Sequence, residues 1–174
     1  MEDQVILVNH EDIPLGSIGK MEAHQLGLLH RAFSIFIFNS KGELLMQQRA
    51  LDKYHSAGLW TNTCCSHPRP FEATHLAASR RLEEEMGMNC KLSYGFNFTY
   101  EASFSNHLTE NEIDHVYFGY TDDLPVINNT EVAAFKFISL PDLLLDLKQN
   151  PDIYTAWLKI CIDKVLAFKN EIYE

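Results

Sequence analysis

Residues 72–87 read EATHLAASRRLEEEMG, and their spacing predicts a helix. Ala78, Leu82 and Met86 recur at every fourth position, which places three apolar side chains on one helical face. Gly87 follows, and glycine is the usual residue just beyond the end of a helix. We therefore expect a helix over residues 72–86 that packs against a core.

The charged face of this helix has two interpretations. Arg80 precedes Glu84, and Arg81 precedes Glu85, by one helical turn, which suits ordinary surface ion pairs. In the other interpretation Glu85 holds Mg²⁺ while Arg81 neutralises a phosphate, because Mg²⁺ often binds through one or two carboxylates together with substrate phosphates. The helix alone does not separate these interpretations.

The rest of the chain alternates predicted strands with helices. Strands are expected at 4–8, at 32–38 with a returning arm at 43–49, at 92–105 with 113–120, and at 133–138. Residues 17–29 suit a short helix or loop, a short helix begins near Pro141, and a long helix covers 152–169. This order predicts an α/β fold of the α+β type: one domain over 1–174 with a mixed sheet flanked by helices, its core spanning about 28–160.

Composition narrows the classes of protein. Hydrophobic residues make up 46% and charged residues 22% of the chain, as in ordinary soluble domains. The net charge of −10 argues against non-specific binding to nucleic acid or to anionic membranes, so an anionic ligand needs a local cluster of cations. No signal-like start or membrane-length apolar run is present, and reduced cysteines are expected. We expect a cytoplasmic monomer, with a dimer as the alternative.

Residues 61–68, TNTCCSHP, place two thiols and an imidazole within four positions. A thiol can act as an acid, a base, a nucleophile or a metal ligand, and an imidazole beside it can bind a metal. Pro68 ends any strand here, so these side chains are expected at the end of a strand.

Together these two segments resemble the Nudix box. The matching positions are Glu72, Arg80, Leu82, Glu84, Glu85 and Gly87. Ser66 stands where the box has its first glycine, and Arg81 stands where it has a catalytic-site glutamate. In Nudix hydrolases that glutamate helps to assemble the metal cluster that activates water. A cation at this position therefore argues against hydrolysis and favours binding of a diphosphate.

A wider pattern, from about Lys20 to Trp157, resembles type I isopentenyl-diphosphate Δ-isomerase, a Nudix-fold enzyme that does not hydrolyse its substrate. The segments that carry the resemblance are Glu22-Ala23-His24, His30-Arg31-Ala32-Phe33, Gln48-Arg49-Ala50, Trp60 through Pro68, and Glu110-Asn111-Glu112. The resemblance implies interconversion of isopentenyl and dimethylallyl diphosphate through a tertiary carbocation, in isoprenoid biosynthesis. One proton is added to the substrate and another is removed.

The resemblance also implies the catalytic groups. The active thiol falls on Cys65, the partner acid or base on Glu112 across the substrate, and an assisting hydroxyl on Tyr100. Which of Cys65 and Glu112 donates the proton is left open by the sequence. Cys64 is expected to turn to the other face of the strand and to pack in the core.

Two metal sites follow from the same resemblance. Glu110 and Glu112 are two apart, so on a strand they share a face. With three histidines they make a mixed nitrogen and oxygen site that suits Mn²⁺ or Zn²⁺. The expected ligands are His24, His30, His67, Glu110 and Glu112. A separate Mg²⁺ is expected on Glu85, the backbone carbonyl of Cys65 and substrate oxygens. The remaining histidines are treated as ordinary surface or core residues; they are His10, His55, His75, His107 and His115.

The cation cluster that an acidic protein needs is located by the resemblance as well. Diphosphate contacts are implied for Lys20, Arg49, Lys53 and Arg81. Trp157 is implied to lay its indole against the developing carbocation. Without the resemblance Trp157 would be a core residue on a helical stripe with Ile153, Ile160 and Lys164, and both roles are compatible.

Two alternatives remain at this stage. One is a Nudix pyrophosphohydrolase that cleaves a nucleoside diphosphate derivative, against which Arg81 and the three histidines argue. The other is a catalytically silent Nudix-fold module that binds a ligand or a metal. The presence of Cys65, Glu112 and all five expected metal ligands argues against it.

Overall fold

A computed structural model describes residues 3–173, with side-chain surroundings described up to residue 169. The strands are β1 (Gln4–Val8), β2 (Pro14–Gly19), β3 (His30–Phe38), β4 (Leu44–Arg49), β5 (Trp60–Thr61), β6 (Cys64–Ser66), β7 (Leu92–Ser103), β8 (Thr109–Tyr120) and β9 (Val132–Ile138). The helices are α1 (Lys20–Leu26), α2 (Thr74–Met86), α3 (Leu140–Gln149), the 3₁₀ turn η1 (Pro151–Ile153) and α4 (Ala156–Tyr173). The predicted mixed sheet flanked by helices is confirmed.

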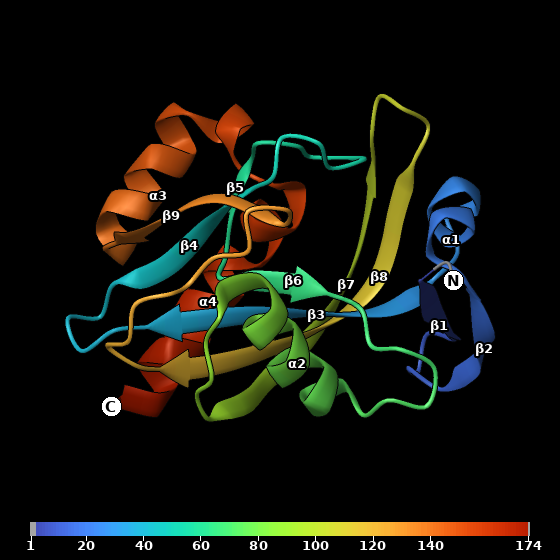
Figure 1. Cartoon of the computed structure of the whole chain (residues 1–174), viewed down its shortest axis with the longest axis horizontal. Coiled ribbons are helices and arrows are strands. Elements are labelled where there is room, and N and C mark those ends of the chain that lie inside the picture. Colours follow the sequence, from blue (N-terminus) through green and yellow to red (C-terminus); the bar gives the residue numbers. More distant parts are fainter. Residues whose placement is uncertain (1–2, 174) are drawn as a thin grey trace.

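Strand β3 is the centre of the sheet (Figure 1). It pairs in parallel with β8 along its whole length, from His30 beside Glu112 to Phe38 beside Tyr120. On its other edge it pairs with β1, β6 and β4 in turn, and β8 continues into the long hairpin with β7. The parallel β3–β8 pair joins segments about 80 residues apart in the chain, so it is not a product of local sequence.

The two faces of β3 build two cores. Phe36 and Phe38 belong to the cluster that α4 covers, whereas Phe33, Ile35 and Ile37 belong to the cluster that α2 covers. All five side chains are fully buried, and burying an aromatic or branched aliphatic side chain is worth about 1.5–3 kcal/mol. The sheet is therefore held between α2 and α4, which lie on opposite sides of it in Figure 1.

Three expectations about the elements need correction in their bounds or extent. Residues 14–19 form the edge strand β2, although residues 17–19 were included in the short helix or loop expected over 17–29. The hairpin of 32–38 with 43–49 forms, but it is joined at two positions only, because β6 lies beside residues 33–35 of β3. Helix α2 begins at Thr74, because Glu72 lies before it and accepts hydrogen bonds from the Arg69 N–H and from Arg80.

The C-terminal helix also differs from its prediction. It begins at Ala156, since residues 151–153 form a 3₁₀ turn and Tyr154 is extended beside Trp60. The predicted stripe is wrong: Ile153 and Ile160 are 41% and 47% exposed. The buried face consists of Trp157, Leu158, Cys161, Ile162 and Val165. These buried residues are adjacent, three apart or four apart in the sequence. The buried stripe is therefore wider than the predicted one, and Ile160 lies outside it.

Candidate active site

Strand register assembles the inner part of the site. The parallel β3–β8 pair places His30 beside Glu112, and the β7–β8 hairpin places Tyr100 directly opposite Glu112. His67 follows the end of β6, and His24 comes from α1. Residues that are far apart in the chain therefore converge where the strands begin or end.

Three imidazoles meet one carboxylate at this point. The Glu112 Oε1 atom lies 2.9 Å from His67 Nε2, 3.2 Å from His30 Nε2 and 4.0 Å from His24 Nε2. One ligand atom from each of these four residues falls within 4.8 Å of the others, which is a spacing that can hold a metal ion. The expected histidines and Glu112 are thus brought together.

Backbone carbonyls orient two of the imidazoles. His24 Nδ1 lies 2.6 Å from the Lys20 carbonyl, and His30 Nδ1 lies 2.7 Å from the Leu28 carbonyl. A carbonyl only accepts, so both Nδ1 atoms carry the proton, and the Nε2 lone pairs point toward Glu112. Neither Nε2 atom has a hydrogen-bond partner although both are buried. Orphaned lone pairs of this kind fit a metal ion.

Burial keeps His24 and His67 in their metal-binding protonation states; burial alone would lower the pKa of His30 as well, but Glu112 raises it. Desolvation lowers the pKa of His24 to about 4 and that of His67 to about 3, so both imidazoles are neutral at pH 7. Burial alone would raise the pKa of Glu112, but His67 and His30 hold it well below its usual range. Glu112 is therefore ionised.

Glu110 lies beside this group of four. Its Oε1 atom is 3.1 Å from His55 Nε2, and its Oε2 atom accepts a 3.0 Å hydrogen bond from the Tyr100 hydroxyl. Glu110 and His55 form a second, overlapping group with His24. His55, which had been treated as ordinary, is buried in the site. No periodicity marks it, and its closeness in sequence to Lys53 is its only signal.

The two adjacent cysteines face opposite ways. Cys64 is buried in the core under α2, while Cys65 packs against the core under α4. The Trp157 indole N–H donates to Cys65 Sγ at 3.1 Å, and the thiol donates to Asn62 Oδ1, also at 3.1 Å. Burial raises the pKa of Cys65 to about 12, so this thiol carries its proton at neutral pH.

Helix α4 reaches Cys65 because its first residues are tied to β5. The Thr155 N–H donates to the Trp60 carbonyl at 3.0 Å, and the Thr155 hydroxyl donates to Thr61 Oγ1 at 2.9 Å. These bonds fix the start of the helix over the strand that precedes Cys65. Trp157 is therefore both a core residue and a neighbour of the thiol.

Two further polar groups near Cys65 were not predicted. Asn62 donates to the carbonyls of Ile35 and Cys64, which fixes the direction of its Oδ1 toward the thiol. Asp114 accepts a 2.7 Å hydrogen bond from Ser34, whose hydroxyl lies 3.6 Å from Cys65 Sγ. Burial raises the pKa of Asp114 well above its usual range. The alternation of Glu110, Glu112 and Asp114 along β8 is a signal that could have found Asp114.

The four expected diphosphate cations line one cavity with Cys65 and Glu112. We call this the inner cavity; it also contains Tyr100, Asp114 and Trp157. The cations are Lys20, Arg49, Lys53 and Arg81. Burial lowers the pKa of Lys20, and the nearby positive charge of Lys53 lowers it further.

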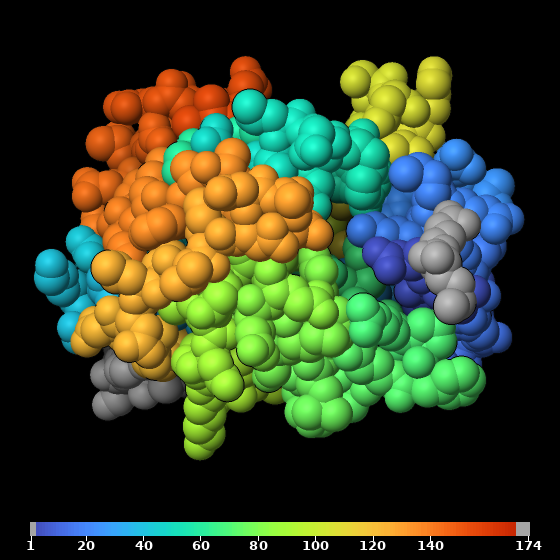
Figure 2. Space-filling view, viewed as in Figure 1, coloured from blue at the N-terminus to red at the C-terminus, as the bar shows by residue number. Residues whose placement is uncertain are grey.

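Glu85 closes the inner cavity on the side of α2. Its carboxylate accepts hydrogen bonds from Gln47 at 3.0 Å and from Arg81 at 2.5 Å, and its side chain is 7% exposed. Arg81 thus faces both a carboxylate and the cavity. The surface is hollowed outside this point, where the teal loop after β4, the orange segment before β9, α2 and the N-terminal elements meet (Figure 2).

Comparison with known proteins identifies the fold. The family model for the NUDIX domain matches residues 28–158. Solved structures with the same fold include DR0079 from Deinococcus radiodurans (TM-score 0.75, 17% identity, 91% of this chain and 96% of that chain) and the MutT protein from Methanosarcina mazei Go1 (TM-score 0.68, 19% identity, 84% and 96%). At these identities the likeness concerns the fold alone.

Similarity in sequence is more specific. Isopentenyl-diphosphate Delta-isomerase 1 of Aromatoleum aromaticum is 56% identical over 98% of this chain and 97% of the relative. Isopentenyl-diphosphate Delta-isomerase of Pectobacterium atrosepticum is 48% identical over 97% and 96%. The chain belongs to the isopentenyl-diphosphate Δ-isomerase family. This isomerase interconverts isopentenyl and dimethylallyl diphosphate in isoprenoid biosynthesis, and its substrate is a small diphosphate.

The family assignment confirms the predicted activity and the Nudix superfamily. All four cysteines of the isomerase lie in the described part of the chain, and none forms a disulfide. Among residues 3–173, no helix has the length and apolar character needed to cross a bilayer.

Proposed function

We propose that Cys65 and Glu112 carry out the two proton transfers of the isomerisation from opposite sides of the substrate. One of them adds a proton to the terminal methylene carbon, which leaves a positive charge on the tertiary carbon. The other removes a proton from the neighbouring methylene group, and the double bond re-forms there. The observation that carries the proposal is that a protonated thiol and an ionised carboxylate line the same cavity.

Trp157 has two roles in this proposal. Its N–H bond to Cys65 Sγ fixes the indole beside the thiol, and the ring already lies 5.3 Å from the Arg49 guanidinium carbon. A carbocation over such a face gains about 2 kcal/mol when it is desolvated. The indole also excludes water, which would otherwise trap the tertiary cation.

Tyr100 positions the carboxylate. Its hydroxyl donates to Glu112 Oε2 at 2.7 Å as well as to Glu110. Burial raises the pKa of Tyr100 well above its usual range, so the hydroxyl keeps its proton. Tyr100 therefore holds Glu112 Oε2 in place while Oε1 faces the histidines.

The three histidines and Glu112, with Glu110 alongside, fit Mn²⁺ or Zn²⁺, because imidazole and carboxylate together suit such ions. When bound, the ion would lower the proton affinity of Glu112. Mg²⁺ would lie on Glu85, with the Cys65 carbonyl and substrate oxygens as further ligands.

The cation cluster would hold the diphosphate. Arg49 presents a planar guanidinium suited to two phosphate oxygens, whereas Lys20 and Lys53 act as point charges. Arg81 would reach the diphosphate from α2 while it stays beside Glu85.

The unpaired cysteines support a reducing, cytoplasmic compartment.

The assignment can be tested on Glu112. We expect Glu112→Gln to lower the rate of isomerisation by more than about 100-fold, because it removes the acid–base group. Metal content is measured in parallel, so that loss of the ion and loss of the carboxylate are told apart. A metal-loaded Glu112→Gln enzyme that isomerises isopentenyl diphosphate at the normal rate would overturn the proposal.

A further inference from the structure

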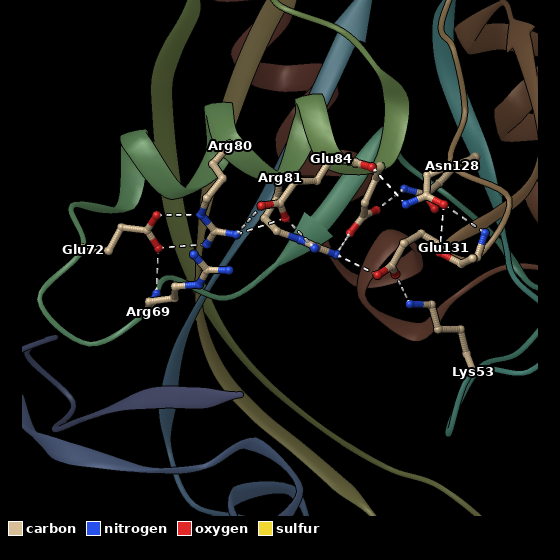
Figure 3. A network of polar contacts seen from close by, with 11 residues as sticks. Lys53, Arg69, Glu72, Arg80, Arg81, Glu84, Asn128 and Glu131 are labelled. Atoms are coloured by element: carbon tan, nitrogen blue, oxygen red, sulfur yellow. Dashed lines mark hydrogen bonds and ion pairs between the residues drawn. The ribbon is translucent and has the colours of Figure 1, made fainter. Parts of the chain in front are cut away.

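Glu131 is an acidic residue at the centre of the cation cluster, and the proposed reaction gives it no role. Its carboxylate forms ion pairs with Lys53 and, at 3.4 Å, with Arg81 Nη2 (Figure 3). These two cations come from different elements, the loop after β4 and helix α2. Glu131 thus bridges two of the groups that are expected to bind the diphosphate.

The carboxylate of Glu131 also lies where an anion would enter. It lines the inner cavity and a second one outside it, which we call the outer cavity. Lys20, Lys53 and Arg81 line both cavities as well. The outer cavity adds Arg69 and Arg80, so cations outnumber acids along this route.

The backbone of Glu131 is fixed, and its side chain is partly exposed to solvent. Its N–H donates to the Asn128 carbonyl at 2.9 Å, and its carbonyl accepts from the Ala50 N–H at 3.0 Å. Asn128 is in turn bonded to the Glu85 carbonyl, which ties this turn to α2. The side chain of Glu131 is 24% exposed, whereas that of Glu85 is 7% exposed and is held by Gln47 as well. Of these two carboxylates, that of Glu131 is the more accessible to solvent.

We propose that Glu131 is an internal counter-ion, which the diphosphate of the substrate displaces from Lys53 and Arg81 and which returns when the product leaves. This inference rests on the proposed diphosphate role of these cations. A carboxylate carries less charge and fewer oxygens than a diphosphate, so it yields to the ligand. The exchange lowers the affinity for substrate and product alike, and it keeps the cations paired in the free enzyme.

Glu84 provides a matched control. Its carboxylate is 2.7 Å from Arg81 Nη1, but its side chain is 40% exposed and borders neither cavity. Glu84→Gln therefore removes a partner of Arg81 without clearing the path of an anion. Glu131→Gln removes a carboxylate partner of Arg81, of the same size and charge, from inside that path.

The test is calorimetric titration of the metal-loaded enzyme with inorganic pyrophosphate, with and without Mg²⁺. We expect Glu131→Gln to lower the Kd for pyrophosphate roughly two- to fivefold in both buffers, because a partly exposed ion pair contributes about that much to an equilibrium constant. Glu84→Gln should leave the Kd unchanged. Glu131→Asp keeps the charge on a shorter side chain, so its Kd should lie between those of the wild type and Glu131→Gln.

Several results would overturn the inference. An unchanged or higher Kd for both Glu131 variants would make this residue a brace that positions the cations. A loss of affinity confined to buffer with Mg²⁺ would make it a metal ligand. Lys53→Gln is titrated alongside: if it does not weaken pyrophosphate binding, the diphosphate role of Lys53 fails, and the counter-ion inference fails with it. Weaker binding by Lys53→Gln combined with no gain from Glu131→Gln would reject the counter-ion alone.

Discussion

In the inner cavity the acid–base groups come from paired strands, whereas in the outer cavity the charged groups come from two helices and from loops and turns. Glu112 is held by Tyr100 and two histidines and is 5% exposed. Lys53 and Arg81 are 23% and 20% exposed, and both form an ion pair with Glu131. The difference suggests that the inner groups are preorganised for the chemical step, while the outer groups exchange one partner for another.

The largest expected effect separates two adjacent thiols of the inner region. Cys65→Ala should lower the rate of isomerisation by about 1,000-fold or more, because it removes one of the two proton carriers. Cys64→Ala should remain at least partly active, since Cys64 packs under α2 on the other face of the strand. Steady-state assays with isopentenyl diphosphate measure both. An active Cys65→Ala beside an inactive Cys64→Ala would reverse the assignment.

A second prediction concerns how firmly the inner site holds its metal. His67→Ala should lose the ion altogether, as elemental analysis of the purified protein would show. His55→Gln should weaken metal binding by about 10–100-fold, because His55 holds Glu110 beside the centre. His115→Gln serves as the control, since His115 pairs with Asp12 outside the site. Equal metal retention by the His55 and His115 variants, in competition with a chelator, would show that His55 only packs.

The charged groups of the outer cavity should affect substrate binding more than the rate of the chemical step. Lys20→Gln is expected to raise KM roughly tenfold, because it removes a half-buried cation that would contact the diphosphate. Its kcat should stay within about twofold, since Lys20 touches no atom that gains or loses a proton. A fall in kcat with unchanged KM would place Lys20 among the groups that act on the transition state.

The smallest expected effect is a pH dependence of stability in the metal-free protein. His24 and His67 have pKa values of about 4 and 3 when folded, against an ordinary value of 6.5. Between these values the unfolded chain binds more protons than the folded one, so stability falls as the pH drops below 6.5. Denaturant unfolding of chelator-treated protein at pH 7 and pH 5 measures this loss. The loss should be smaller in His67→Gln, and an equal loss would assign the effect to other groups.

Much of this arrangement could be predicted from local sequence. The helix at 72–86, the β7–β8 hairpin and the separation of Cys64 from Cys65 follow from periodicity, and the likeness to the isomerase family located the remaining candidates. Long-range pairing was not visible in the same way. The β3–β8 register, which sets His30 beside Glu112, depends on contacts between distant segments. His55 and Glu131 lie in loop and turn segments, where no repeat marks which side chains turn inward.

In the proposed mechanism, Cys65 and Glu112 exchange protons with the substrate. Conversion of isopentenyl diphosphate by the Mg²⁺-supplied enzyme in D₂O tests it most directly, because both groups exchange their protons with solvent. We expect dimethylallyl diphosphate that carries solvent deuterium in a methyl group, formed without release of phosphate. Product free of deuterium would mean that hydrogen migrates within the substrate, and it would rule out proton transfer through Cys65 and Glu112.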